Sequence, residues 1–184
     1  PFAVNAHVNY FDEDRAEYLA DANCKIVKFG IESGSEPIRR KVLKRYMSNK
    51  RMFQSIRIAK QYGLHTSVFL MIGLPFETQD DLMKTIDFVS RAKPGRFRWT
   101  FFYPFPGTLA YKLSVTGGYV NFAQMQSLMN FTESSCLDFG AKQNLILKKL
   151  GLILPWFVNA YSNLPVADFY RKKVKEILEM DEKK

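Results

Sequence analysis

The apolar residues of this chain recur with two different periods, which predicts strands and helices in turn. Short runs that are apolar throughout or at every second position indicate strands, whereas apolar residues three or four positions apart indicate helices. Strands are expected over residues 2–8, 26–31, 66–72 and 96–103. Helical patterns follow the first three strands, over residues 12–24, from Pro37, from about Asn49 and from Thr78.

Several helix boundaries are marked by residues that suit the ends of helices. Pro37 fits a first helical turn, because its missing amide hydrogen would have no partner there. Gly63 is suited to end the helix that begins near Asn49. Thr78 and Asp81 have the spacing of a capping box, which predicts the start of another helix. The apolar stripes expected to face the core are Met52, Phe53, Ile56 and Ala59 in one helix and Leu82, Ile86 and Val89 in the other.

This regular alternation predicts an α/β fold with a parallel sheet, because short loops after helices cannot return the next strand antiparallel. An open doubly wound sheet and a partial β/α barrel of about four strands are both compatible with the pattern. In either architecture ligands bind where the carboxyl ends of the strands meet the following loops. The loops expected at that end are "GIESGS", "GLPFET" and "YPFPGT".

After residue 113 the pattern changes, and we expect a mainly helical C-terminal extension over residues 114–184. Its helices are expected to break at Pro155 and Pro165. The apolar segment 145–158 contains Lys148 and Lys149 and is shorter than the roughly 20 residues of a membrane span. We therefore interpret it as a packed or amphipathic helix and predict no membrane span.

With 47% hydrophobic and 24% charged residues among 184, the chain has enough apolar material for the core of a soluble globular domain. A strand pattern starts directly after Pro1, so we expect a piece of a longer protein. Cys24 and Cys136 are too few for a Cys-x-x-Cys metal site or a disulfide framework. This cysteine usage fits a cytoplasmic protein and predicts no metal site in this chain.

The formal net charge of +9 is unevenly placed, because residues 39–60 contain many basic residues and no acidic ones. Such a block could neutralise the phosphates of a nucleic acid. The alternative is a solvated outer face of two helices, which is what surface charge usually means. The basic residues are Arg39, Arg40, Lys41, Lys44, Arg45, Lys50, Arg51, Arg57 and Lys60.

The loop after the second strand allows two interpretations. Glu32 stands at the end of the strand and on the opposite side from Ile31, where its carboxylate could accept hydrogen bonds from ribose hydroxyls or an amino group. Gly30 and Gly34 flank it and would permit a close approach of backbone to ligand, or turns with positive φ. Alternatively, Glu32 caps the next helix or pairs with one of the basic residues.

The two later loops leave similar alternatives. In "IGLPFET", Gly73 leaves space above the strand and Pro75 directs the chain away, so a flat ligand could lie there, or the turn could need both residues for its geometry. Glu77 could simply be a favourable charge near a helix N-terminus. Tyr103 and Phe105 of "YPFPGT" could stack on a ligand or belong to the core.

Taken in order, "KIVKFGIESGSEPIRRKVLKR", "GLHTSVFLMIGLPFETQDDLMKTIDF" and "FFYPFPGTLAYKL" resemble the second half of the catalytic domain of radical S-adenosylmethionine (radical SAM) Fe-S oxidoreductases, especially those with a cobalamin-binding domain. The resemblance covers about residues 2–113 and implies a partial or full β/α barrel in which the matching strands are the third to sixth. It also implies reductive cleavage of S-adenosylmethionine by a [4Fe-4S] cluster to start radical chemistry.

The resemblance implies where S-adenosylmethionine binds but assigns no catalytic residue. Glu32 and Ser33 would approach its ribose or methionyl part, while Ile72, Gly73 and Pro75 would line the adenine. Backbone near Tyr103 and Pro104 would complete that side. The expected cofactor-binding residues are therefore Glu32, Ser33, Gly34, Ile72, Gly73, Pro75, Tyr103 and Pro104.

Relatives hold the cluster with a Cys-x3-Cys-x2-Cys loop that this chain lacks, so we expect the chain alone to be inactive. The resemblance implies a small-molecule substrate and a reductant protein for the longer parent, and it allows cobalamin. An RNA-modifying enzyme similar to methylthiotransferases, or a non-catalytic barrel scaffold, is the alternative. The first strand would leave an open sheet edge, which predicts self-association through that edge.

Overall fold

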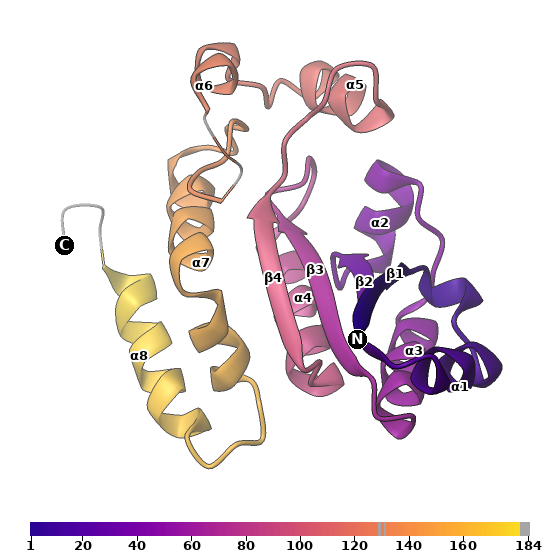
Figure 1. Cartoon of the computed structure of the whole chain (residues 1–184). Helices are drawn as coiled ribbons and strands as arrows, with labels where there is room; N and C mark the ends of the chain where they lie inside the picture. The colour runs from indigo at the N-terminus through magenta and orange to yellow at the C-terminus, as the bar shows by residue number, and fades with distance from the viewer. Residues whose placement is uncertain (129, 131, 181–184) are drawn as a thin grey trace.

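The computed structural model describes residues 1–128, 130 and 132–180. Its centre is a four-stranded parallel sheet in the order β1-β2-β3-β4 (Figure 1). The strands span Phe2–Ala6 (β1), Cys24–Glu32 (β2), His65–Ile72 (β3) and Arg96–Phe101 (β4). The apolar runs thus predicted every strand, and the ends differ by no more than two residues. The first strand is shorter than expected because Val8–Tyr10 form a single 3-10 turn.

The order of the strands decides between the two architectures that the sequence left open. A doubly wound sheet reverses its strand order at one point, whereas neighbours in a β/α barrel are also neighbours in sequence. Here order in space equals order in sequence. The fold is therefore a partial β/α barrel with a helical C-terminal part.

Of the helices between the strands, three begin after a residue whose side chain caps them, and the one that begins at Glu36 has no such side-chain hydrogen bond. They span Glu13–Asp21 (α1), Glu36–Leu43 (α2), Asn49–Gln61 (α3) and Gln79–Ala92 (α4). Pro37 lies in the first turn of α2, as predicted. The predicted capping box is present, because the Thr78 hydroxyl accepts from Asp81 N at 3.2 Å while the Asp81 carboxylate accepts from Thr78 N at 3.1 Å. Gly63, with a φ of 69°, follows the end of α3.

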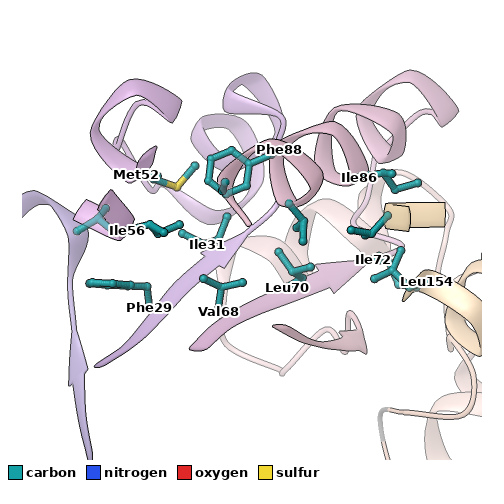
Figure 2. Close-up of a cluster of buried hydrophobic side chains, with 14 of the residues drawn as sticks. Phe29, Ile31, Met52, Ile56, Val68, Leu70, Ile72, Ile86, Phe88 and Leu154 are labelled. Atoms are coloured by element: carbon teal, nitrogen blue, oxygen red, sulfur yellow. The ribbon is translucent and has the colours of Figure 1, made fainter. Parts of the chain in front are cut away.

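One face of the sheet packs against these helices and forms the main core (Figure 2). The strands contribute alternate residues, which are Val27, Phe29 and Ile31 from β2 and Val68, Leu70 and Ile72 from β3. The predicted helix stripes are also buried, except that Phe53 is half-buried and packs its ring 4.6 Å from that of Phe88. Each fully buried apolar side chain contributes roughly 1.5–3 kcal/mol.

The C-terminal part is helical, as predicted, and it shares this core. Its helices span Leu109–Thr116 (α5), Phe122–Ser127 (α6), Ala141–Ala160 (α7) and Ala167–Glu179 (α8). Leu147, Leu150, Leu154 and Phe157 of α7 belong to the same buried cluster as the sheet. The division of the chain near residue 113 stays a prediction.

Both prolines of this part lie at interruptions of helices, as predicted. The backbone leaves helical geometry at Ile153, two residues before Pro155, with φ and ψ of −132° and 30°, so α7 consists of two helical pieces joined at a kink. Pro165 lies in the turn between α7 and α8.

Lys149, one of the two lysines in the apolar segment, is 9% exposed and donates hydrogen bonds to the backbone oxygens of Leu178 (3.1 Å) and Met180. Within the described residues, no helix is both long and apolar enough to cross a membrane.

Candidate functional site

Glu32, at the end of β2, forms an ion pair within the chain. Its Oε1 lies 2.8 Å from Arg45 Nη1, and Arg45 Nη2 donates to the Gly30 backbone oxygen at 3.1 Å. Glu32 has a φ of 67° and stands where the pairing of β2 with β3 shifts register. Burial raises the pKa of Glu32, and the charge of Arg45 opposes that rise. Pairing with the basic block, one of the alternatives left open, is thus observed.

Ser33 and Gly34 attach this loop to α4. Ser33 is fully buried, and its hydroxyl lies 3.2 Å from that of Thr85 and accepts from Ser35 N at 3.2 Å. Gly34 N donates to the Thr85 hydroxyl at 2.8 Å, and a Cβ on Gly34 would lie 2.3 Å from the Lys84 backbone oxygen. The close approach that Gly34 permits is therefore to α4. A role for either residue in cofactor binding stays a prediction.

The turn after β3 is held by Glu77. Gly73 has a φ of 76°, which favours glycine, and Gly73 N donates to Glu77 Oε2 at 2.7 Å, as Leu74 N does at 3.2 Å. Glu77 is 4% exposed, and its Oε1 has no hydrogen-bond partner among the described residues. Burial raises the pKa of Glu77 to about 8, against the opposing effect of these hydrogen bonds. Glu77 therefore stabilises the turn through hydrogen bonds to its backbone and is not simply a charge near a helix end.

The three residues expected to line the adenine lie beneath the C-terminal part. Ile72, Gly73 and Pro75 are all buried. The side chains nearest to a Cβ built on Gly73 are those of Leu147, at 3.5 Å, and Ser135, at 3.7 Å. The structure thus shows a tight turn that needs glycine for its backbone geometry. Contact of these three residues with a ligand stays a prediction.

A pocket of about 370 Å³ opens at the carboxyl ends of β3 and β4. Tyr103 is the one predicted cofactor-binding residue in its lining; Pro104 is buried beside it. The Tyr103 hydroxyl donates to the Met125 backbone oxygen at 3.4 Å, and its ring centroid lies 4.9 Å from that of Phe105. Phe105 also lines the pocket, and the lining further includes Leu43, Lys44, Met71, Thr100, Phe102 and Leu109.

Two of these residues could have been found from the sequence. Met71 alternates with the buried residues Leu70 and Ile72, and Thr100 precedes the buried Phe101. Period-two alternation places both on the other face of the sheet, at its carboxyl end. The pocket combines apolar side chains, a tyrosine ring and a threonine hydroxyl. Such a lining suits a flat heteroaromatic group.

The cysteines do not provide a metal site. Cys24 and Cys136 are both buried and unpaired. Across residues 1–128, 130 and 132–180, no three His, Cys, Asp or Glu side chains lie close enough to hold a metal ion. These residues do not fit a [4Fe-4S] cluster, which requires several thiolates.

The radical SAM superfamily matches residues 2–89. This part of the chain belongs to that superfamily. The match includes β1 to β3 and most of α4, and therefore the loops that carry Glu32 and Gly73.

The relatives are much longer than this chain. An uncharacterized methyltransferase of Pyrococcus horikoshii is 29% identical over 114 residues, which cover 62% of this chain and 25% of that protein. A tRNA-2-methylthio-N(6)-dimethylallyladenosine synthase of Thermotoga petrophila is 30% identical over 106 residues, which cover 55% of this chain and 24% of that protein. The aligned part of this chain thus spans about a quarter of the curated relatives' length.

A solved structure extends the likeness to almost the whole chain. Elp3 of the archaeon Methanocaldococcus infernus, with its N-terminus deleted, superposes on 95% of this chain and 41% of its own with a TM-score of 0.61. The sequences are 14% identical, so this likeness concerns the fold alone. It includes the helical C-terminal part together with the sheet.

Proposed function

We propose that this chain is part of the catalytic domain of a radical SAM enzyme and that the pocket at the ends of β3 and β4 binds the adenosyl group of S-adenosylmethionine. The observation that carries the proposal is the position of this pocket. It lies at the carboxyl ends of parallel strands, where ligands of β/α barrels bind, in a chain whose residues 2–89 belong to this superfamily. When bound and reduced, S-adenosylmethionine supplies a 5′-deoxyadenosyl radical that abstracts hydrogen from a substrate.

The residues of this chain would bind and shield the adenosyl group. Met71, Phe102 and Tyr103 present apolar surface to a purine ring and would keep water away from it. Lys44 lines the pocket directly before Arg45, which fixes Glu32. The second carboxylate oxygen of Glu32 has no hydrogen-bond partner among the described residues, so it could accept a hydrogen bond from a ribose hydroxyl.

The cluster must be held outside the residues described here, because these do not provide its ligands. We therefore propose that the chain alone binds the adenosyl group without cleaving S-adenosylmethionine. The small-molecule substrate, the reductant protein and the use of cobalamin implied by the resemblance belong to the longer protein and form part of this proposal.

The test is a calorimetric titration of the chain with S-adenosylhomocysteine, which carries the same adenosyl group. Thr100→Phe fills the pocket and should weaken binding at least about ten-fold, since it places a ring where the ligand lies. Thr116→Phe adds the same ring at an exposed position of α5 and should leave binding unchanged. Equal affinity in all three proteins would rule out this pocket. In the longer protein, reconstituted without oxygen and reduced, absence of 5′-deoxyadenosine would rule out the activity.

The second candidate is RNA modification, which the likeness to a tRNA-modifying synthase favours. The structure divides the basic block into two groups. Arg39 is fully buried and donates to Met47 O (3.0 Å) and Asn49 Oδ1 (2.7 Å), and Arg51 donates to Phe11 O at 3.0 Å. These two, with Arg45, stabilise loops. The residues that remain exposed are Arg40, Lys41, Lys44, Lys50, Arg57 and Lys60.

The RNA candidate predicts binding that weakens steeply with salt. Replacing Arg40, Lys50 and Arg57 together by Gln should flatten the plot of log affinity against log salt by about 0.7 for each phosphate that the protein no longer neutralises. A matched triple variant, Lys112→Gln, Lys142→Gln and Lys175→Gln, removes the same charge elsewhere on the surface. Equal effects of the two variants on binding of a single-stranded RNA would show unspecific attraction and remove this candidate.

A further inference from the structure

The face of the sheet that is turned away from the helices carries a cluster of positive charges. In the register of the strands, Lys28 of β2 pairs with Ser67 of β3, and Ser67 pairs with Arg96 of β4. Two residues further along β3, on the same face, Phe69 pairs with Arg98 of β4. Neighbouring strands are about 4.8 Å apart, so Lys28 and Arg96 flank Ser67 from both sides and Arg98 lies beside Phe69. They line a cavity of about 130 Å³ together with Ile26 and His65, which we call the cationic hollow.

The charges of the cationic hollow are not compensated within the described part of the chain. Lys28, Arg96 and Arg98 form no ion pair with any described carboxylate, whereas cations elsewhere do, among them Arg15, Arg45, Lys84, Arg91, Arg171 and Lys173. Lys28 on β2 and the two arginines on β4 lie on either side of β3, so their like charges repel one another across it. An anion bound between them would remove that cost.

The other groups of the hollow suit an anion that is attached to a larger molecule. Ser67 is 5% exposed, and its hydroxyl has no hydrogen-bond partner among the described residues, so it can donate to an oxyanion. Phe69 is half-buried and offers an apolar surface beside the cations. Arginine side chains bind phosphates and carboxylates with two parallel hydrogen bonds. We propose that the cationic hollow binds a phosphate or carboxylate group of the enzyme's substrate.

If the adenosyl group binds as proposed above, the position of the hollow also sets the length of this substrate. Ser67 and Met71 lie on the same face of β3, four residues apart, which corresponds to about 13 Å. Met71 lines the proposed adenosyl pocket. The substrate carbon that loses a hydrogen atom must lie beside this pocket. The anionic group is therefore about 13 Å from that pocket, with Phe69 in contact with the part between. This describes an elongated small molecule with an anionic end.

The experiment is an NMR titration of the chain with inorganic phosphate and, separately, with succinate at constant ionic strength. We expect saturable shifts of the Ser67 and Phe69 amide signals. Arg98→Gln should weaken binding roughly ten-fold, the effect of one charge-assisted hydrogen-bond pair. Arg91→Gln on α4 is the control and should bind as the unchanged protein does, because Arg91 lies outside the hollow. Tighter binding of phosphate than of succinate would indicate a phosphorylated substrate, and the reverse a carboxylic acid.

Three results would overturn the proposal. Amide shifts that do not saturate would show general attraction of the anion to a basic protein. Equal weakening of anion binding by Arg98→Gln and Arg91→Gln would show the same. Shifts of the same amides by a single-stranded RNA, tighter than by phosphate, would assign the hollow to a nucleic acid. Loss of phosphate binding in the longer protein would show that its own carboxylates compensate the cations. S-adenosylhomocysteine binding should be unchanged in Arg98→Gln, so failure of the adenosyl pocket and failure of the hollow are separate results.

Discussion

The two faces of the central sheet differ in what their side chains do. On the helix-covered face, Val68 and Leu70 of β3 are buried in the main core (Figure 2). On the other face, Phe69 and Met71 of the same strand are half-buried and line cavities. One strand therefore carries core residues at its even-numbered positions and candidate binding groups at its odd-numbered ones. Alternation along a strand separates the two roles by a single residue.

The largest effect is expected from truncating neighbouring residues on opposite faces. Leu70→Ala removes a side chain that is 2% exposed and should lower the free energy of unfolding by about 2–5 kcal/mol, because it leaves a cavity. Met71→Ala should cost about 1 kcal/mol or less and instead weaken S-adenosylhomocysteine binding. Urea unfolding and calorimetry measure the two quantities. Similar losses of stability in both variants would contradict the division of roles.

The next effect concerns Glu77, whose carboxylate is buried although it belongs to a loop at the binding end. Its pKa of about 8 lies above its ordinary value of 4.5, so between these pH values the folded protein binds more protons than the unfolded chain. The free energy of unfolding should therefore be highest near pH 5 and fall as the pH rises to 8, by up to about 1.4 kcal/mol per pH unit.

The control for this pH dependence keeps the shape of the side chain. Glu77→Gln retains an oxygen that can accept from Gly73 N, and it removes the titrating group. Its unfolding free energy, measured by urea titration at several pH values, should lack the slope, whereas Glu17→Gln at an exposed position should retain it. An unchanged slope in Glu77→Gln would assign the pH dependence to another group.

The smallest effect is expected at the edge of the sheet, which belongs to neither face. Among the described strands, β1 pairs only with β2, so its outer edge is open to another strand. The chain should therefore self-associate with rising concentration in sedimentation velocity. Ala3→Lys places a charge on this strand and should reduce association, with a change in stability within about 0.5 kcal/mol. Ala22→Lys, after α1, is the matched control, and a monomer at all concentrations would contradict the prediction.

The sequence predicted elements better than contacts. Strand alternation, the capping box at Thr78 and Asp81, and the proline in α2 were all readable, because each depends on residues close together in the chain. The partners of the loop residues were not. Glu32 pairs with Arg45, thirteen positions away, and Gly34 packs against α4, about fifty positions away. Such contacts require knowledge of which helices lie beside which strand ends.

By itself, the sequence determined the α/β class, the three loops at the binding end and the resemblance to radical SAM enzymes, because these depend on local periodicity and on motifs in a fixed order. Only the tertiary structure decided that the sheet is a partial barrel, that Ile72, Gly73 and Pro75 are covered, and that an open pocket lies beside Met71 and Tyr103. It also showed that Lys28 and Arg98, seventy positions apart, flank one hollow. The physical reason is that burial and charge compensation depend on groups brought together across strands, and local sequence does not contain that arrangement.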